Sequence, residues 1–286
     1  MNMAGPEELY LDLMKKALSF ALWPEPPFPI TRLNYKRRFI SRHFVSLVSR
    51  VLRIGHFQLV KDVPWTEEQR TNGKVWPGYA DTMIGMKRLD NLQSCVETVI
   101  KDQIEGDLIE TGVWRGGACI FMRAILAAHG IEDRKVFVAD SFEGLPKPDA
   151  EKYPADKGDR HHIQKFLEVS QAEVQANFER FGLLDDQVVF LKGWFKDTLP
   201  NAPIDKIAVL RLDGDMYGST MDALTNLYPK LADGGFCIID DYGLSGCRKA
   251  VDDFRAAEGI ASDLQTIDWS GRYWRKGTKT SCERAA

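Results

Sequence analysis

The stretch Val209-Leu-Arg-Leu-Asp-Gly-Asp-Met-Tyr-Gly218 decides the fold that this sequence predicts. It begins as the end of a buried strand, and the apolar run stops where Asp213 and Asp215 follow. Further along, a second apolar run, Phe236-Cys-Ile-Ile239, ends in Asp240-Asp241. In open α/β sheets the carboxyl ends of the strands form the binding crevice. Two such strands side by side would therefore bring four carboxylates into one small volume.

Four carboxylates so close together repel one another unless a cation lies among them. A hard divalent ion with oxygen ligands, most simply Mg²⁺, is the economical explanation. The alternative is that these aspartates are helix N-caps that follow strands, which is a common role for a single aspartate. Because two pairs occur at two strand ends, we expect the metal site.

Composition bounds the class of protein. The chain has 286 residues, 44% of them hydrophobic, which suffices for one large α/β domain with a full core. The net charge of −3 argues against a generally basic nucleic-acid binder, so we expect no nucleic-acid partner. The five cysteines form no Cys-x-x-Cys pair, which fits a reducing cytoplasm and no zinc site. No apolar stretch is long enough to span a bilayer and no signal-peptide pattern is present, so we expect a cytoplasmic protein.

A cofactor site is indicated by two neighbouring strands. The strand from Asp107 runs into the glycine-bearing turn Glu110-Thr-Gly-Val-Trp-Arg-Gly-Gly117, and a helix is predicted to follow from Ala118 to His129. Glycines let a ligand approach the backbone, and the helix N-terminus offers free N–H groups. The next strand, from Lys135 to Ala139, ends in Asp140-Ser141, and an acidic residue there is the usual partner of ribose hydroxyls. Together these features predict a cofactor that contains a nucleoside.

The segment from Phe142 to His162 is too long for an ordinary connection, and such segments tend to be lids or binding loops. His161 and His162 close it before a helix predicted from Ile163 to Phe181. They are either the solvated start of that helix or part of the site. Further on, Gly193-Trp-Phe195 follows a strand, so its aromatic side chains either sandwich a flat ring or belong to the core.

A basic segment lies near the start, between Arg32 and Lys61, with eight cations and no acidic residue. Apolar residues alternate with the cations in a helical pattern, so we predict a basic amphipathic helix. It is either a docking helix with a solvated basic face or a contact for an anionic membrane surface or an acidic partner. The cations are Arg32, Lys36, Arg37, Arg38, Arg42, Arg50, Arg53 and Lys61.

Several segments together resemble the macrocin-type O-methyltransferases, sugar-modifying enzymes of macrolide and aminocoumarin antibiotic pathways. They run in order through most of the chain. The segments are Thr82-Met-Ile-Gly-Met-Lys-Arg-Leu, Glu110-Thr-Gly-Val-Trp-Arg-Gly-Gly-Ala-Cys-Ile, Val138-Ala-Asp-Ser-Phe, Phe181-Gly-Leu-Leu-Asp-Asp, Gly193-Trp-Phe-Lys-Asp-Thr, Leu212-Asp-Gly-Asp, Ile239-Asp-Asp-Tyr, Cys247-Arg-Lys-Ala-Val and Tyr273-Trp-Arg.

This resemblance implies a Rossmann-like class I methyltransferase, an α/β fold whose mostly parallel seven-stranded sheet carries helices on both faces. We expect an N-terminal helical or lid extension at 1–80, the methyltransferase domain at 81–277 and a flexible tail at 278–286. The implied activity is transfer of a methyl group from S-adenosylmethionine, with Mg²⁺, to a sugar hydroxyl. A homodimer or higher homo-oligomer is also expected. The alternative is a catechol-type O-methyltransferase, which would act on vicinal aromatic hydroxyls.

The resemblance also implies roles for individual residues. Asp213, Asp240 and Asp241 correspond to metal ligands and Asp215 to the base. Apart from the resemblance, we expect His161 or His162 as the alternative base if the loop folds over the acceptor. Glu110, Trp114, Asp140 and Ser141 correspond to the cofactor site. We expect the other cofactor-binding residues to be Thr82, Met83, Thr111, Gly112, Gly193, Trp194, Phe195 and Asp213.

Two regions depart from the macrolide enzymes: the basic segment and the loop at 145–160. Both lie where that family contacts its acceptor. The acceptor is therefore expected to be a different sugar, for example one in a glycoside, a natural product, a glycolipid or a polysaccharide precursor. Segment 32–61 is expected to add peripheral membrane contact.

Overall fold

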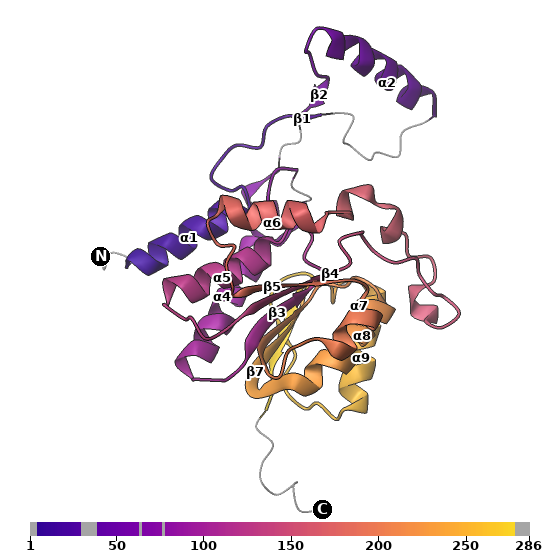
Figure 1. Ribbon diagram of the computed structural model, residues 1–286. Coiled ribbons are helices and arrows are strands. Elements are labelled where there is room, and N and C mark those ends of the chain that lie inside the picture. Colours follow the sequence, from indigo (N-terminus) through magenta and orange to yellow (C-terminus); the bar gives the residue numbers. More distant parts are fainter. Residues whose placement is uncertain (1–4, 30–38, 63–64, 76–77, 278–286) are drawn as a thin grey trace, which may run out of the picture.

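A central sheet organises the computed structural model, which describes residues 5–29, 39–62, 65–75 and 78–277 (Figure 1). Its seven strands stand in the order β5-β4-β3-β6-β7-β9-β8. β3 to β7 are mutually parallel, whereas β9 pairs antiparallel with β7 and with β8. The strands are β3 (Asp107–Thr111), β4 (Val136–Asp140), β5 (Val188–Lys192), β6 (Ile207–Leu212), β7 (Leu231–Ile239), β8 (Gln265–Thr266) and β9 (Arg272–Arg275).

The strand order locates the binding crevice. From β3 the chain proceeds outward through β4 to β5, and later through β6 to β7 on the other side. The order therefore reverses between β3 and β6, and a ligand crevice forms at the carboxyl ends of the strands at such a point. All six residues of β6 are buried, as expected for a parallel strand covered on both faces. The predicted pairing of β6 with β7 is confirmed.

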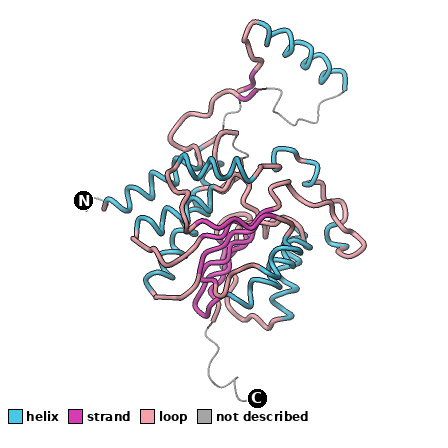
Figure 2. The backbone as a smooth tube through the Cα atoms, viewed as in Figure 1, coloured by secondary structure: helices cyan, strands magenta, loops and turns pink. Residues whose placement is uncertain are grey.

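Helices cover both faces of the sheet, which confirms the predicted architecture (Figures 1 and 2). One apolar core cluster joins side chains of α1, α4, α5 and α6, and a second joins those of α8 and α9. The helices are α1 (Pro6–Leu18), α4 (Met86–Lys101), α5 (Gly117–Ala128), α6 (Gln171–Arg180), α7 (Phe195–Thr198), α8 (Tyr217–Leu227) and α9 (Ser245–Ala257). None of the helices among the described residues is both long and apolar enough to cross a membrane.

The helix predicted to start at Ile163 was wrong at its beginning. Ser170 is the N-cap, and its side chain accepts a hydrogen bond from the Glu173 N–H at 3.2 Å, so α6 starts at Gln171. The preceding stretch forms two short 3₁₀ helices, η3 (His161–Ile163) and η4 (Lys165–Leu167). The long loop therefore extends to Val169. Helix α8, directly after Asp215, was not predicted at all.

The N-terminal region contains two different kinds of structure. α1 belongs to the main core, since Leu11, Met14 and Leu18 are buried in the same cluster as α4 and α5. By contrast, α2 (Phe39–Ile54) stands away from the body in Figure 1. It is connected through the small sheet of β1 (Phe28–Pro29) and β2 (Val60–Lys61), which α3 (Glu67–Thr71) follows.

The predicted domain boundaries stay predictions. The tail at 278–286 lies outside the described residues, as do the cations of the basic segment from Arg32 to Arg38. The rest of that segment includes the predicted amphipathic helix, which the structure describes from Phe39 to Ile54.

Candidate active site

A cleft opens where the crevice is expected, at the carboxyl ends of β3, β4, β5 and β6 and beneath the long loop. The predicted base Asp215 lines it. Of the predicted cofactor residues, those that line it are Thr82, Met83, Glu110, Gly112, Trp114, Asp140, Ser141, Gly193, Trp194, Phe195 and Asp213. Thr111 does not line it, and its side chain is fully buried in β3. The structure thus brings almost all of the residues assigned from sequence to one cleft. Their individual roles stay predictions.

At Gly112 the turn after β3 comes very close to the end of β6. Its φ is +83°, and a Cβ there would lie 1.7 Å from the carbonyl oxygen of Asp213. On either side, the Asp213 N–H donates to the Thr111 carbonyl and the Gly112 N–H donates to the Ala139 carbonyl, both at 2.9 Å. Only glycine fits this crossing, which joins the end of β6 to the turn after β3.

Asp140 braces the glycine turn. Its carboxylate accepts hydrogen bonds from the N–H groups of Val113 at 2.8 Å and Phe142 at 2.7 Å. Burial raises the pKa of Asp140, and these N–H groups oppose that rise. The carboxylate thus ties the end of β4 to the turn after β3. Binding of ribose hydroxyls by the same group stays a prediction.

Three residues just after strands have left-handed backbones although none is glycine. They are Trp114 after β3 (φ 48°), Phe142 after β4 (φ 57°) and Asp215 after β6 (φ 56°). Such conformations cost about 1 kcal/mol or more each and gather at functional sites. Their position at three strand ends around one cleft supports its assignment as the active site.

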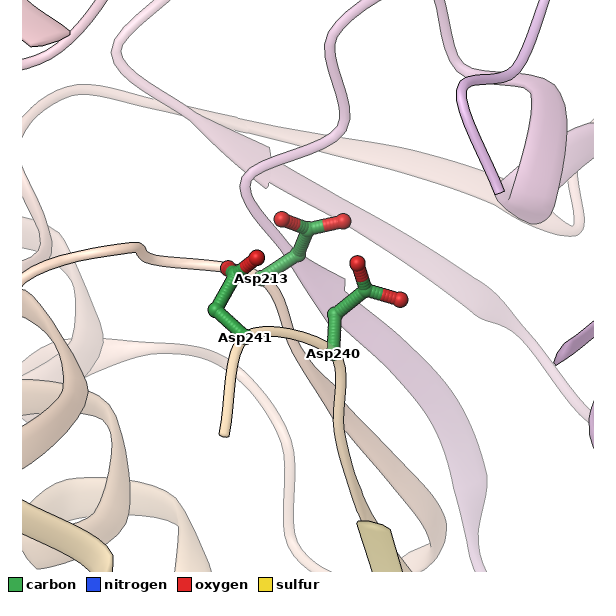
Figure 3. Close-up of side chains that lie close together, drawn as sticks. All are labelled: Asp213, Asp240 and Asp241. Atoms are coloured by element: carbon green, nitrogen blue, oxygen red, sulfur yellow. The ribbon is translucent and has the colours of Figure 1, made fainter. Parts of the chain in front are cut away.

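The acidic cluster forms at the ends of β6 and β7 (Figure 3). Asp213, Asp240 and Asp241 each offer an oxygen, and these oxygens lie within 4.8 Å of one another. Opposite ligands of one Mg²⁺ are about 4.2 Å apart, so small side-chain movements suffice to bind an ion. Carboxylate oxygens are also the donors that a hard cation prefers. The donor set therefore fits a divalent metal.

Two arginines that sequence reasoning missed also lie in this cluster. Arg211, fully buried in β6, forms ion pairs with Glu110, Asp240 and Asp213. Arg88 of α4 contacts Asp240 at 2.5 Å and Asp268 at 2.7 Å. The cation that the clustered acids require is thus supplied in part by the protein, which corrects the argument that a metal alone explains them. The sequence did contain one indication of this contact, because Arg211 is a charged residue inside the otherwise apolar strand β6.

Negative charge remains in excess despite the two arginines. Burial raises the pKa of both Asp213 and Asp241 well above the usual range, and the neighbouring carboxylates add to the effect. Burial, with the charges of Asp213 and Asp240, also raises the pKa of Asp215 to about 8. The cluster therefore favours bound protons or a bound cation over its bare anionic state.

His161 and His162 lie on η3, outside the lining of the cleft. The Nδ1 atom of His161 is 2.7 Å from Asp159, and Nδ1 of His162 is buried with no hydrogen-bond partner. Neither histidine contacts Asp215 in the hydrogen bonds of the described residues. Their role as alternative bases stays a prediction.

Comparisons with known proteins agree with this arrangement. The family model for macrocin O-methyltransferase (TylF) matches residues 7–276. An 8-demethyl-8-(2,3-dimethoxy-alpha-L-rhamnosyl)-tetracenomycin-C 4'-O-methyltransferase from Streptomyces olivaceus is 49% identical, over 94% of this chain and 92% of its own. Mycinamicin III 3''-O-methyltransferase from Micromonospora griseorubida is 46% identical, over 94% and 96%. The solved structure of the O-methyltransferase NovP has a TM-score of 0.81 at 47% identity and covers 95% of this chain and all of that one.

The fold and the cleft thus define a class I methyltransferase, an enzyme of the S-adenosylmethionine-dependent group. The chain belongs to the macrocin O-methyltransferase family and is an O-methyltransferase, as the resemblance in the sequence predicted.

Proposed function

We propose that the enzyme methylates a sugar hydroxyl of a glycosylated small molecule and that it uses a divalent metal, most simply Mg²⁺, to do so. The observation that carries the proposal is the acidic cluster beside the cleft, formed by Asp213, Asp240 and Asp241. The name of one relative, 49% identical, specifies methylation of a rhamnosyl-tetracenomycin at the 4' position, which supports a sugar acceptor.

The reaction is an in-line displacement in which most of the catalytic work is positioning. The bond between the sulfonium and its methyl group breaks as the acceptor oxygen bonds to that methyl, which leaves S-adenosylhomocysteine. The acceptor hydroxyl must lose a proton. Asp215 lines the cleft and lies two residues after Asp213, so we assign it as the base that takes this proton.

Three carboxylates, those of Asp213, Asp240 and Asp241, would hold the metal. When bound, it would supply Lewis-acid chemistry that lowers the pKa of an acceptor hydroxyl. Arg211 and Arg88 fix the Asp240 carboxylate from the side, so that this ligand is oriented before any ion arrives. On the donor side the Asp140 carboxylate is held by backbone N–H groups and not by the acidic cluster, so the donor should bind without the metal.

A labelled methyl donor incubated with a panel of glycosides and catechols tests the proposal. We expect methylated glycosides and no methylated catechols, loss of turnover in excess chelator and recovery with Mg²⁺. Binding of S-adenosylhomocysteine, measured by calorimetry, should persist in chelator. Full turnover in chelator would refute the metal, and turnover of catechols alone would refute the sugar acceptor.

Helix α2 is the basis for a proposal about partners. Phe44, Leu47, Val51 and Ile54 recur at helical spacing along one face and are 60–82% exposed. The opposite face points inward: Ser49 is buried, and with Arg53 it lines a small cavity beside Tyr79. The helix thus turns its apolar face outward. We propose that a second copy of the chain covers this face, because an apolar stripe is self-complementary across a two-fold axis.

Light scattering and liposome co-sedimentation distinguish this proposal from the membrane contact expected of segment 32–61. We expect a dimer in solution, which Leu47→Glu with Val51→Glu converts to monomer, while Gln58→Glu outside the stripe leaves it intact. A monomeric wild type that pellets with anionic liposomes in low salt would instead support membrane contact. We also propose that the enzyme is cytoplasmic.

A further inference from the structure

The first turn of α8 lacks a cap of its own. The helix starts at Tyr217, directly after Asp215 and Met216, and the N-cap Met216 has no side chain that accepts a hydrogen bond. The first N–H groups of a helix need acceptors from elsewhere. Asp156 provides them from the long loop: its carboxylate accepts from the Tyr217 N–H at 2.6 Å and the Gly218 N–H at 2.9 Å. The Asp156 side chain is buried.

The space around this carboxylate is shaped for it. Gly246 stands in the first turn of α9, where an added Cβ would lie 3.0 Å from Oδ1 of Asp156. At Gly218 an added Cβ would lie 3.4 Å from Oδ2 and 2.7 Å from the ring of Tyr153. Two helix N-termini therefore meet at Asp156, and their partial positive charge favours an anion.

Asp156 also completes the support of Asp215. The Asp215 N–H donates to the carboxylate of Asp241 at 3.1 Å, and the Met216 N–H donates to the Gly214 carbonyl at 2.5 Å. Asp156 accepts from the next two N–H groups, those of Tyr217 and Gly218. All four consecutive backbone N–H groups from residue 215 to residue 218 therefore have acceptors. A non-glycine residue at φ 56° persists only where its surroundings over-determine it. Asp156 is one of the contacts that do so.

The same contact places the loop. Lys152 and Tyr153, just before Asp156, line the cleft. The Tyr153 ring packs beside that of Tyr217, with centroids 5.6 Å apart. Burial raises the pKa of Asp222 in α8, and the nearby charge of Lys152 opposes that rise. The long loop and the first turn of α8 are therefore held together, and the buried carboxylate of Asp156 connects them.

We propose that Asp156 is a positioning residue for methyl transfer: by capping α8 from the loop, it holds Asp215 and the acceptor-side loop as one unit. Asp156 lines the cleft, but its carboxylate is engaged by the N–H groups of α8, so we assign it no contact with the reacting atoms. This inference rests on the proposed function, in which Asp215 takes the acceptor proton. It adds a residue whose loss should disturb the acceptor side and leave the donor side intact.

Hydrogen exchange and kinetics on Asp156→Ala and Asp156→Asn test the inference, with Glu151→Gln as the control because Glu151 is an exposed carboxylate of the same loop. In Asp156→Ala we expect the amides of 150–160 and 215–220 to exchange faster together, by at least about tenfold. For the acceptor, kcat/KM should fall at least about tenfold, while the Kd of S-adenosylhomocysteine changes less than about twofold. Asp156→Asn keeps one carbonyl oxygen and should be intermediate.

Unchanged exchange in both segments would overturn the inference, and so would an equal loss of donor and acceptor affinity, which marks a merely structural role. If Asp156→Ala does not fold, the asparagine variant decides by the same criteria. The exchange measurement needs no acceptor. A wild type that methylates no glycoside would therefore count against the proposed function, while the coupling of loop and helix would still be judged by exchange.

Discussion

The donor half of the cleft, Gly112 to Trp114 with Asp140 to Phe142, is held by backbone contacts, whereas the acidic half, Asp213, Asp215, Asp240 and Asp241, is held by charge. In the donor half the single carboxylate, Asp140, is satisfied by N–H groups of the protein. In the acidic half two arginines balance only part of the negative charge. The donor half, whose carboxylate is already hydrogen-bonded, can bind a ligand without a counter-ion. The acidic half, with its excess negative charge, requires a cation.

The two halves touch at Gly112, and substitution there is expected to have the largest effect. In Gly112→Ala the new methyl group would overlap the carbonyl of Asp213, so both strand ends must shift. We expect a loss of about 4 kcal/mol or more in the free energy of unfolding, measured by denaturant titration. Gly130→Ala, at a glycine with open space around it, controls for the left-handed backbone alone. Similar losses in both variants would show that the contact between the halves contributes nothing.

Asp215→Asn separates chemistry from binding within the acidic half. Loss of the base should lower kcat about 10³-fold, while affinities for S-adenosylhomocysteine and Mg²⁺ stay within about twofold. Asp205→Asn, at the other end of β6, is the matched control and should behave as wild type. Near-normal rates in Asp215→Asn would remove this residue from the role of base.

Asp240→Asn tests whether charge holds the acidic half. Each oxygen of Asp240 faces an arginine, so the variant leaves two buried cations partly unpaired. We expect about 3 kcal/mol less stability to thermal or denaturant unfolding, together with loss of Mg²⁺ affinity. Asp140→Asn would be damaging in the donor half but should leave Mg²⁺ affinity unchanged. Equal Mg²⁺ affinity in Asp240→Asn and wild type would exclude Asp240 as a ligand.

Trp114→Phe is expected to have the smallest effect, because it removes one neutral hydrogen bond and keeps an aromatic ring. The Trp114 Nε1–H donates to the Phe166 carbonyl at 2.9 Å, which connects the donor half to the long loop. A bond of this kind contributes about 1 kcal/mol, which corresponds to about a fivefold rise in acceptor KM. Steady-state kinetics with saturating donor measure it. A larger rise in the donor Kd than in the acceptor KM would contradict the prediction, because it would show that this hydrogen bond supports donor binding instead.

Most of the sheet could be predicted from sequence because apolar runs of β3, β4, β6 and β7 end in glycine or aspartate, and each end is a local signal. The same ends yielded most of the cleft residues. What escaped prediction depends on partners far away in the chain. Helix α8 has a weak start in sequence, since Met216 is no cap and Asp156 performs that task from the loop. Arg88 forms an ion pair with Asp268, which lies 180 residues further along the chain, and no local sequence pattern predicts such a pair.

The left-handed residues Trp114, Phe142 and Asp215 have a consequence for engineering. At Phe142 and Trp114 glycine would leave a cavity in the apolar core, whereas at Asp215 it would relax the backbone without emptying the core, so a search for thermostable variants would find its gain at Asp215. That gain would remove the side chain assigned as the base, which lines the cleft. Selection for heat resistance and selection for turnover should therefore conflict here, and a safe programme of stabilisation would work elsewhere, on exposed loops and helix surfaces.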